Sequence, residues 1–204
     1  MSEDIRIGGI NLFDMLKDMG FEDVKDEDKN KTAPPFLVRD TVDWNLIQKL
    51  SVTELKDYLV ETRFIEQDSI IYKTLHSEAS EFIILYGYEY DPFYVVATII
   101  AADSSYNHAS IAGMERQNES VFILDIKVRN KDANKGYGSL LLEQLKTNAI
   151  SKGKYMITGD LTPEDLRDHG DRLIHFYRKH GFEIEEFGHY AKIKWTNPDV
   201  ILNK

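Results

Sequence analysis

The sequence predicts a mixed α/β domain in which a mostly antiparallel sheet is flanked by helices. Short apolar runs rich in β-branched and aromatic residues alternate with stretches of good helix formers. Glycine, proline and polar segments separate these runs. The predicted order is strand, two helices, three strands, helix, strand, helix, strand, which lets neighbouring strands pair and the helices cover the sheet.

The first part of the chain divides near a pair of prolines. Residues 10–19 have the spacing of a short amphipathic helix, and residues 22–31 are almost entirely charged or polar, as in a linker. The pair at 34–35 marks the change to a short apolar strand over 36–39. The boundaries that we expect are 1–33 for an appendage and 34–204 for the main domain.

Two helices are predicted at the start of this domain. Residues 43–48 and 51–66 both have helical patterning. Ser51 and Glu54 have the spacing of a capping box, in which each side chain bonds the backbone N–H of the other residue. We therefore expect two consecutive helices joined by a tight turn.

A hairpin is predicted next. The runs 81–88 and 93–101 have strand composition, and the proline-containing segment 89–92 separates them. The following segment, 103–118, is polar and contains glycine, so it predicts a long connection. Loops of that length in compact domains are often functional.

The most informative stretch is a glycine-rich turn between a strand and a helix. A strand is predicted over 121–128 and a helix over 137–151, and between them residues 133–139 read Ala-Asn-Lys-Gly-Tyr-Gly-Ser. The first amides of a helix have no internal partner, and the helix dipole places about half a positive charge there. Gly136 and Gly138 would let a phosphate approach without meeting a Cβ. The turn therefore predicts a phosphate site.

Two nucleotide motifs do not fit this turn. A dinucleotide fingerprint requires a third glycine at the position of Leu141. A triphosphate loop requires a lysine before Ser or Thr, whereas Ser139 follows Gly138 directly. The turn on its own leaves the kind of phosphate open.

Three further elements complete the predicted sheet. They are a strand over 155–161, a helix over 171–180 that ends at Gly181, and a strand over 191–195. Between the first two lies an acidic segment, 160–171. We expect a solvated loop with helix caps there, and the alternative is a segment that grips a cationic substrate.

In two places the sequence resembles the GNAT superfamily of acyl-CoA-dependent N-acetyltransferases. The family's phosphate loop, Arg or Gln, two variable residues, Gly, one variable residue, then Gly or Ala, falls on 133–138, with Ala133 in the first position. The family's Tyr-x-x-x-Gly-Phe signature falls on 177–182. Order and spacing agree over roughly residues 36–195. The resemblance implies a GNAT-type fold and direct transfer of an acetyl group from acetyl-CoA to a primary amine in a ternary complex.

The resemblance also implies how the cofactor is held. Backbone groups of Ile126 and Val128 are expected beside the pantetheine. The ammonium of Lys135 can add positive charge near the diphosphate, although exposed loop lysines are often only solvated. The turn residues expected around the diphosphate are Ala133, Asn134, Lys135, Gly136, Gly138 and Ser139.

Tyr177 is the catalytic candidate that the resemblance implies. It falls on the family's tyrosine, whose hydroxyl commonly lies near the cofactor sulfur and can donate a proton as the thiolate leaves. The alternative is an aromatic side chain packed on the sheet, since Phe176 and Phe182 are close in sequence.

A general base is less well defined. A lysine-like amine has a pKa of about 10.4, so presenting it neutral at pH 7 costs about 4–5 kcal/mol. The glutamate of many relatives falls near Phe122, so Glu119 and Asp125 are candidates by proximity. Glu119 can instead cap a strand end, and Asp125 can pair with a neighbour. Strand alternation predicts Asp125 on the face opposite Ile126.

Composition limits the partners. The formal net charge of −10 disfavours nucleic acid and favours a cationic amine, from a small molecule or a protein. The chain has no cysteine for a disulfide or a thiolate, and its six histidines lack metal-site spacing, so no metal is predicted. No apolar segment has membrane-spanning length, and we expect a cytoplasmic protein.

Two other functions stay open at this stage. One is a GNAT-fold acyl-CoA-binding or regulatory module without turnover, which is favoured by Ala133 and by the missing glutamate. The other is an assembly role in which the helix expected within 1–33 docks on a partner subunit, for example in a homodimer.

Overall fold

The computed structural model describes residues 6–7, 10–11, 42–77, 80–116 and 119–201. Their elements, in chain order, are β1 (Arg6–Ile7), β2 (Ile10–Asn11), α2 (Trp44–Ile47), α3 (Val52–Glu61), β3 (Ser69–His76), β4 (Phe82–Tyr88), β5 (Tyr94–Ile100), β6 (Tyr106–Arg116), β7 (Ser120–Lys127), the 3-10 turn η1 (Asn130–Asp132), α4 (Tyr137–Ser151), β8 (Met156–Leu161), α5 (Pro163–Lys179), β9 (Glu183–Glu186), β10 (Ala191–Thr196) and α6 (Pro198–Ile201).

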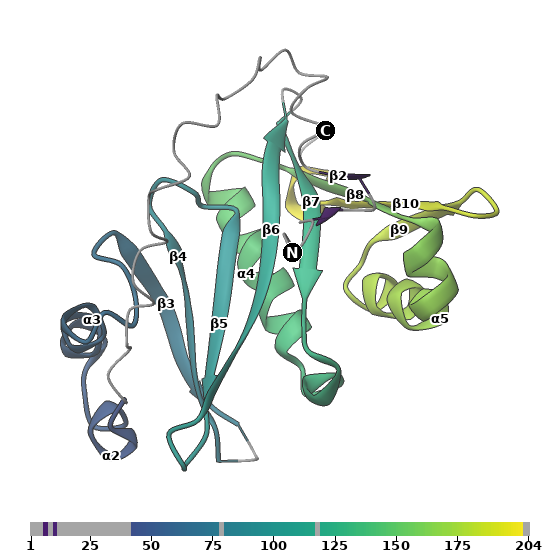
Figure 1. Cartoon of the computed structure of the whole chain (residues 1–204). Coiled ribbons are helices and arrows are strands. Elements are labelled where there is room, and N and C mark those ends of the chain that lie inside the picture. Colours follow the sequence, from purple (N-terminus) through teal and green to yellow (C-terminus); the bar gives the residue numbers. More distant parts are fainter. Residues whose placement is uncertain (1–5, 8–9, 12–41, 78–79, 117–118, 202–204) are drawn as a thin grey trace, which may run out of the picture.

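One eight-stranded sheet organises the molecule (Figure 1). Its strand order is β3-β4-β5-β6-β7-β8-β10-β9. Each neighbouring pair is antiparallel except β7 and β8, which run parallel. The predicted mixed α/β class with a mostly antiparallel sheet is therefore confirmed.

Two apolar clusters cover the two faces of the sheet. Side chains of β4 alternate between them, because successive residues of a strand point to opposite faces. Ile83 and Leu85 join the cluster under α4, whereas Ile84 and Tyr86 join the cluster under α2 and α3. The fully buried side chains of α4 in the first cluster include Leu141, Leu142, Leu145 and Ala149.

Several predicted elements agree with the structure. The capping box at the start of α3 forms as expected: the Glu54 N–H donates to Ser51 Oγ, and the Ser51 N–H donates to Glu54 Oε2. The hairpin of β4 and β5 and the strand, turn and helix from β7 to α4 also lie where the sequence predicted them.

The expected connection over 103–118 is wrong, because residues 106–116 form β6. This strand is central and pairs with β5 on one side and β7 on the other. Its buried positions, Ala109 and Ile111, alternate with polar residues that obscure the apolar pattern. Pairing on both edges outweighs the polar composition, since strand formation depends strongly on tertiary context.

The expected start of the last long helix is also wrong. α5 begins at Pro163, where Thr162 and Asp165 form a second capping box, so most of the acidic segment 160–171 is helical. The helix is kinked at His169, whose φ and ψ are −146° and 15°. The capping signal Thr-Pro-Glu-Asp was present in the sequence.

Other differences lie at the ends of the sheet. The strands β3 and β9 were not predicted. Of the helix expected over 10–19, residues 10–11 form β2 and the others lie outside the described residues, as does the strand expected over 36–39. Within the described residues, no helix is long and apolar enough to cross a membrane.

Replacing Leu145 should test the packing of α4 on the sheet. Its side chain is fully buried in the larger cluster, so we expect Leu145→Ala to lower the free energy of unfolding by about 2–5 kcal/mol. Ile150, which lies on the same helix and is 42% exposed, provides the control, because Ile150→Ala should change stability by about 0.5 kcal/mol or less. Urea unfolding of both variants measures this. Equal losses of unfolding free energy in the two variants would contradict the packing of Leu145 against the sheet.

Candidate functional site

A cleft opens where two strands of the sheet move apart. The parallel pairing joins Ser120–Ile123 of β7 to Met156–Gly159 of β8. Beyond Ile123, no strand in the described part of the chain pairs with this edge of β7, and Figure 1 shows β7 and β8 running in different directions. A cavity of about 1020 Å³ lies there, bounded by β7, the glycine-rich turn, α5 and the end of β8.

The first turn of α4 faces this cleft. Gly136, the N-cap residue, has φ +86°, and no side chain caps the helix. The first hydrogen bond of the helix runs from the Leu140 N–H to the Gly136 carbonyl at 3.1 Å, so the amides of residues 137–139 have no partner within the helix. Gly136, Gly138 and Ser139 all line the cleft. The positive end of the helix dipole therefore lies at its wall.

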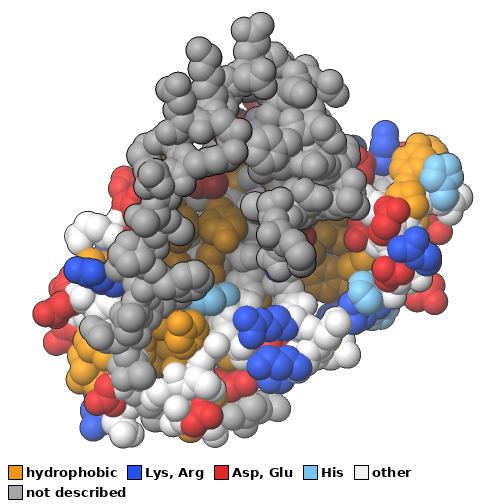
Figure 2. All heavy atoms as spheres, viewed as in Figure 1, with side chains coloured by type: hydrophobic (Ala, Val, Ile, Leu, Met, Phe, Trp, Pro, Cys, Tyr) orange, Lys and Arg blue, Asp and Glu red, His pale blue; other side chains and the backbone are white. Residues whose placement is uncertain are grey.

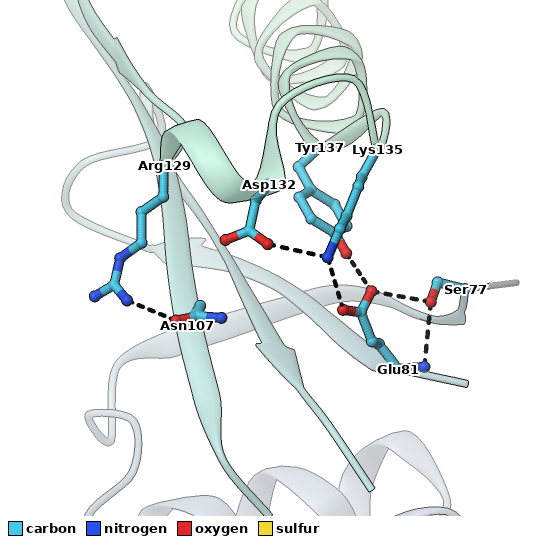
Figure 3. Close-up of polar contacts among 7 residues, drawn as sticks. All are labelled: Ser77, Glu81, Asn107, Arg129, Asp132, Lys135 and Tyr137. Carbon is cyan, nitrogen blue, oxygen red and sulfur yellow. Dashed lines mark hydrogen bonds and ion pairs between the residues drawn. The ribbon is translucent and has the colours of Figure 1, made fainter. Parts of the chain in front are cut away.

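Most of the other predicted cofactor residues line the cleft. Ala133 and Asn134 line the cleft with the glycines, as do Ile126 and Val128, although Val128 lies just beyond the end of β7. Lys135 does not. The lysine Nζ lies 3.1 Å from Glu81 Oε1 and 3.1 Å from Asp132 Oδ1. Figure 3 draws both contacts as dashed lines.

The expectation that the Lys135 ammonium adds charge to the phosphate site therefore needs correction. Its ammonium is paired with the carboxylates of Glu81 and Asp132, and its backbone N–H already donates to the Asp132 carbonyl at 3.4 Å. An anion in this cleft would meet backbone amides at the turn rather than this side chain.

Glu81 anchors the turn and was not predicted from the sequence. Its carboxylate accepts hydrogen bonds from the Tyr137 hydroxyl, from Lys135 and from Ser77 (Figure 3). Burial raises the pKa of Glu81, but these three hydrogen bonds outweigh it, so the pKa lies below its usual value. Burial and the bond to Glu81 raise the pKa of Tyr137.

Tyr177 is packed in the core and also lines the cleft, so its position is compatible with both alternatives that the sequence left open. Its side chain is 3% exposed, and its ring packs edge-on against Phe176 and Phe182, with centroid distances of 5.1 and 5.2 Å. Yet Tyr177 lines the cleft, and its hydroxyl forms no hydrogen bond with the described residues. Burial raises its pKa, and the charges of Asp165 and Asp125 raise it further.

The two candidate bases lie in different places. Asp125 lines the cleft, and its carboxylate forms an ion pair with Lys127 at 3.1 Å. Asp125 and Ile126 pair in regular register with Ala112 and Ile111 of β6, so their side chains point to opposite faces of the strand, as alternation predicted. Both residues line the cleft, as do all residues from 123 to 129, and the bulge at Leu124 lies just before them.

Glu119 is not brought to the cleft. It precedes β7 at the end where β7 and β8 are paired, with φ +54°, and its carbonyl accepts a hydrogen bond from the Tyr155 N–H at 3.1 Å. Its side chain is exposed. Glu119 thus lies at the end of β7 opposite to the cleft, whereas Asp125 lies at the cleft.

Helix α5 and the end of β8 add polar residues that the sequence reasoning did not assign to the site. Figure 2 shows acidic, basic and histidine side chains intermixed over the region of α5, β9 and β10. The titratable residues from α5 and β8 that line the cleft are Asp160, Asp165, His169, Arg172, His175, Tyr177 and Lys179. No group of three acidic or histidine side chains suited to a metal ion occurs among the described residues.

Comparisons with known proteins give short or distant similarities. No family model matches the chain. The uncharacterised protein YocC of Bacillus subtilis (strain 168) is 36% identical over 83 residues, which are 40% of this chain and 48% of that protein. The chain thus matches about half the length of this curated relative.

Solved structures similar to this chain include Ard1 and two acetyltransferases. Ard1 from Thermoplasma volcanium is 18% identical, with 52% of this chain and 70% of that chain covered and a TM-score of 0.42. A Bacillus subtilis acetyltransferase in complex with CoA is 16% identical (53% and 80% covered, TM-score 0.38). The ribosomal-protein-S18-alanine N-acetyltransferase from Escherichia coli is 13% identical (51% and 69%, TM-score 0.39).

The anchor at Glu81 gives a pH-dependent prediction. We expect Glu81→Gln to lower the free energy of unfolding by about 1–3 kcal/mol, because the bonds from Tyr137 and Lys135 lose a charged acceptor. The pKa of Glu81 is lower in the folded protein than in the unfolded chain. The stabilisation that ionised Glu81 gives to the folded protein is therefore fully present above the unfolded-state pKa and is lost as the pH falls through the folded-state pKa.

Urea unfolding of both proteins from pH 7 down to pH 3 measures this difference. The difference in free energy of unfolding between the native protein and Glu81→Gln should become smaller toward acid pH. Glu61→Gln, at an exposed residue at the end of α3, is the control and should leave stability nearly unchanged at every pH. A gap that widens at low pH would contradict the prediction.

Proposed function

We propose that this protein is a GNAT-type N-acetyltransferase that moves an acetyl group from acetyl-CoA to a primary amine. The observation that supports this most strongly is the meeting of three features in one cleft: an unpaired edge of β7, the uncapped start of α4 and the Tyr177 hydroxyl. The strand edge would bind the amides of the pantetheine, the start of α4 would bind the diphosphate, and the Tyr177 hydroxyl would lie near the thioester sulfur.

The pantetheine would lie along β7. An extended chain with amide groups can add to an open strand edge through backbone hydrogen bonds, and β7 offers such an edge after Ile123. Ile126 and Val128 are the residues that we propose for these contacts. The diphosphate would then lie at the turn, against the amides of Gly138 and Ser139 and beside Gly136.

The proposed reaction is direct attack of the amine on the thioester carbonyl. A carbon–nitrogen bond forms, the carbon–sulfur bond breaks, and the thiolate leaves. Tyr177 is the proposed general acid, because it lines the cleft and its hydroxyl forms no hydrogen bond with the described residues. The ammonium loses one proton before attack, and Asp125 is the proposed group to receive it, since this residue lines the same cleft. The nitrogen cation formed by attack loses a second proton, which restores the Tyr177 hydroxyl after its own proton has gone to the thiolate.

We propose a cationic amine as the acceptor, from a small molecule or a protein. Asp125, Asp160 and Asp165 all line the cleft. The charges of Asp165 and Asp125 act on the pKa of Tyr177, and the same charges would favour a cation beside this tyrosine. The formal net charge of −10 would attract such an amine over longer distances.

A second function, acyl-CoA binding without turnover, is favoured by specific observations. Asp125 is engaged by Lys127, Glu119 lies away from the cleft, and Ala133 cannot offer the side-chain contact of Arg or Gln. Isothermal titration with coenzyme A and thiol release from acetyl-CoA across a panel of amines separate the two functions. Binding with thiol release supports the enzyme, binding alone supports the module, and no binding at millimolar coenzyme A would exclude both.

Replacing Tyr177 tests its role as an acid. We expect Tyr177→Phe to lower kcat by about 100-fold or more, because the ring keeps its packing while the proton donor is removed. The dissociation constant of coenzyme A should change little. Tyr190→Phe, a change away from the cleft, is the matched control and should leave kcat nearly unchanged. A Tyr177→Phe enzyme that folds and keeps full kcat would sink the assignment.

A charge placed at the start of α4 tests the diphosphate site. Gly138→Asp and Gly138→Asn add side chains of nearly equal size, and both should be compatible with the first turn of a helix. The aspartate should weaken coenzyme A binding by about tenfold more than the asparagine, or about 1.4 kcal/mol, because its carboxylate repels the diphosphate and competes for the same amides. Titration calorimetry measures both. Equal affinities would place the diphosphate elsewhere.

A further inference from the structure

Ser139 belongs to a hydrogen-bonded chain that leads away from the cleft. Its Oγ lies 2.9 Å from Nε2 of His180, and Nδ1 of the same ring lies 2.9 Å from Glu143 Oε1. Ser139 and Glu143 are one turn apart on α4, and His180 is the C-cap residue of α5. Ser139 lines the cleft, whereas the His180 side chain is 10% exposed and lies behind it.

The carboxylate end of the chain fixes the direction of the hydrogen bonds. An ionised carboxylate accepts hydrogen bonds and cannot donate them, so Nδ1 of His180 must be the donor to Glu143. Burial raises the pKa of Glu143, but the hydrogen bonds from Lys146 and His180 outweigh it and keep the pKa below its usual value. Glu143 is therefore ionised near neutral pH.

The charge of His180 then decides what Ser139 can offer to a ligand. In the neutral imidazole, Nε2 is an acceptor, so the Ser139 hydroxyl must donate to it and presents lone pairs to the cleft. In the imidazolium, Nε2 donates to Ser139 Oγ, and the hydroxyl proton is free for another acceptor. A phosphate oxygen in the cleft can accept that proton only in the second arrangement.

We propose that His180 is a positioning residue for anion binding, which takes up a proton when a phosphate group accepts a hydrogen bond from Ser139. The proposal rests on the proposed function, because it takes the phosphate to be part of coenzyme A. No covalent bond changes: one proton moves from solvent to His180, and the Ser139 hydroxyl turns from Nε2 toward the phosphate.

The surroundings of His180 are suited to this change. In the described part of the chain, the charged side chains that contact it are Glu143 and Lys146, both from α4; Lys146 Nζ donates to Glu143 Oε1 at 2.9 Å and to the His180 carbonyl at 2.8 Å. From its own helix, the ring contacts Phe176, with a centroid distance of 4.8 Å. Lys146 is itself held over the rings of Phe182 and Trp195. An added charge on His180 would thus face an ionised carboxylate.

Proton uptake on binding tests the proposal directly. Coenzyme A would be titrated into the protein at pH 7 in two buffers with different heats of ionisation, and the difference in heat gives the protons taken up. Histidine changes charge between about pH 5 and 8, so the native protein should take up a measurable fraction of a proton. His180→Gln and Ser139→Ala should both lose that fraction. Any uptake by the phosphates of coenzyme A is common to all three proteins and cancels.

Affinity gives a second measurement. The glutamine side chain of the His180→Gln variant can donate its amide N–H to Ser139 at any pH, so the variant should bind coenzyme A with an affinity that changes little from pH 6 to pH 8. The native protein should bind more weakly as the pH rises, by at most about tenfold per unit, because binding is linked to the uptake of one proton. His180→Ala should bind more weakly than His180→Gln, which separates positioning of the hydroxyl from simple packing.

Three results would overturn the proposal. Equal proton uptake by the native protein, His180→Gln and Ser139→Ala would exclude it while leaving the proposed function intact. Covalent labelling of Ser139 by a fluorophosphonate, abolished in His180→Gln, would assign the same chain to a nucleophilic serine. Failure of coenzyme A to bind would remove both this proposal and the proposed function.

Discussion

The candidate site depends on the short parallel contact between β7 and β8. Each strand is held along its length by an antiparallel partner, β7 by β6 and β8 by β10. The two halves of the sheet are joined by the ladder that ends at the pair Ile123 and Gly159. Gly159 lies at the point of divergence, where an added Cβ would come within 3.1 Å of the Ile193 side chain and 3.5 Å of Ile123. The missing Cβ at Gly159 thus lets Ile193 and Ile123 pack closely at the last pair of the ladder, and the cleft lies beyond this pair.

Helix α4 gives the cleft its electrostatic character. Its buried leucines fix the helix against the sheet, so its uncapped first turn is held at the wall of the cleft. Below the turn, Glu81 holds both Tyr137 and Lys135. This arrangement holds the lysine of the turn, Lys135, away from the anion site and leaves partial charges on fixed backbone amides there. Such dipoles need no rearrangement when an anion binds, whereas a flexible lysine loses side-chain entropy.

Local signals predicted the parts of the fold that local interactions determine. The pairing of Ser51 with Glu54 spans one helical turn, and the glycine-rich turn before α4 is written in seven consecutive residues. The parts that were missed depend on distant residues. β6 forms because two other strands pair with it, despite its polar composition. The contact of Lys135 with Glu81 spans 54 positions, and that of Ser139 with His180 spans 41. No periodicity in the sequence reports such contacts, so single residues at the site were predicted less well than the elements that hold them.

The proposed reaction sets a requirement on protons that the buried tyrosine can meet. Burial raises the pKa of Tyr177 above that of a thiol, which is about 8.5, so full transfer of its proton to a free thiolate would be uphill. Attack by an amine, however, creates a nitrogen cation beside the same hydroxyl. If the departing sulfur accepts the phenolic proton while that cation gives up its own, the tyrosine is never left as a free anion in an apolar site. Tyr177 then acts as a relay whose raised pKa keeps it protonated before and after each turnover, and Asp125 is needed for the first deprotonation of the incoming amine rather than for the last step.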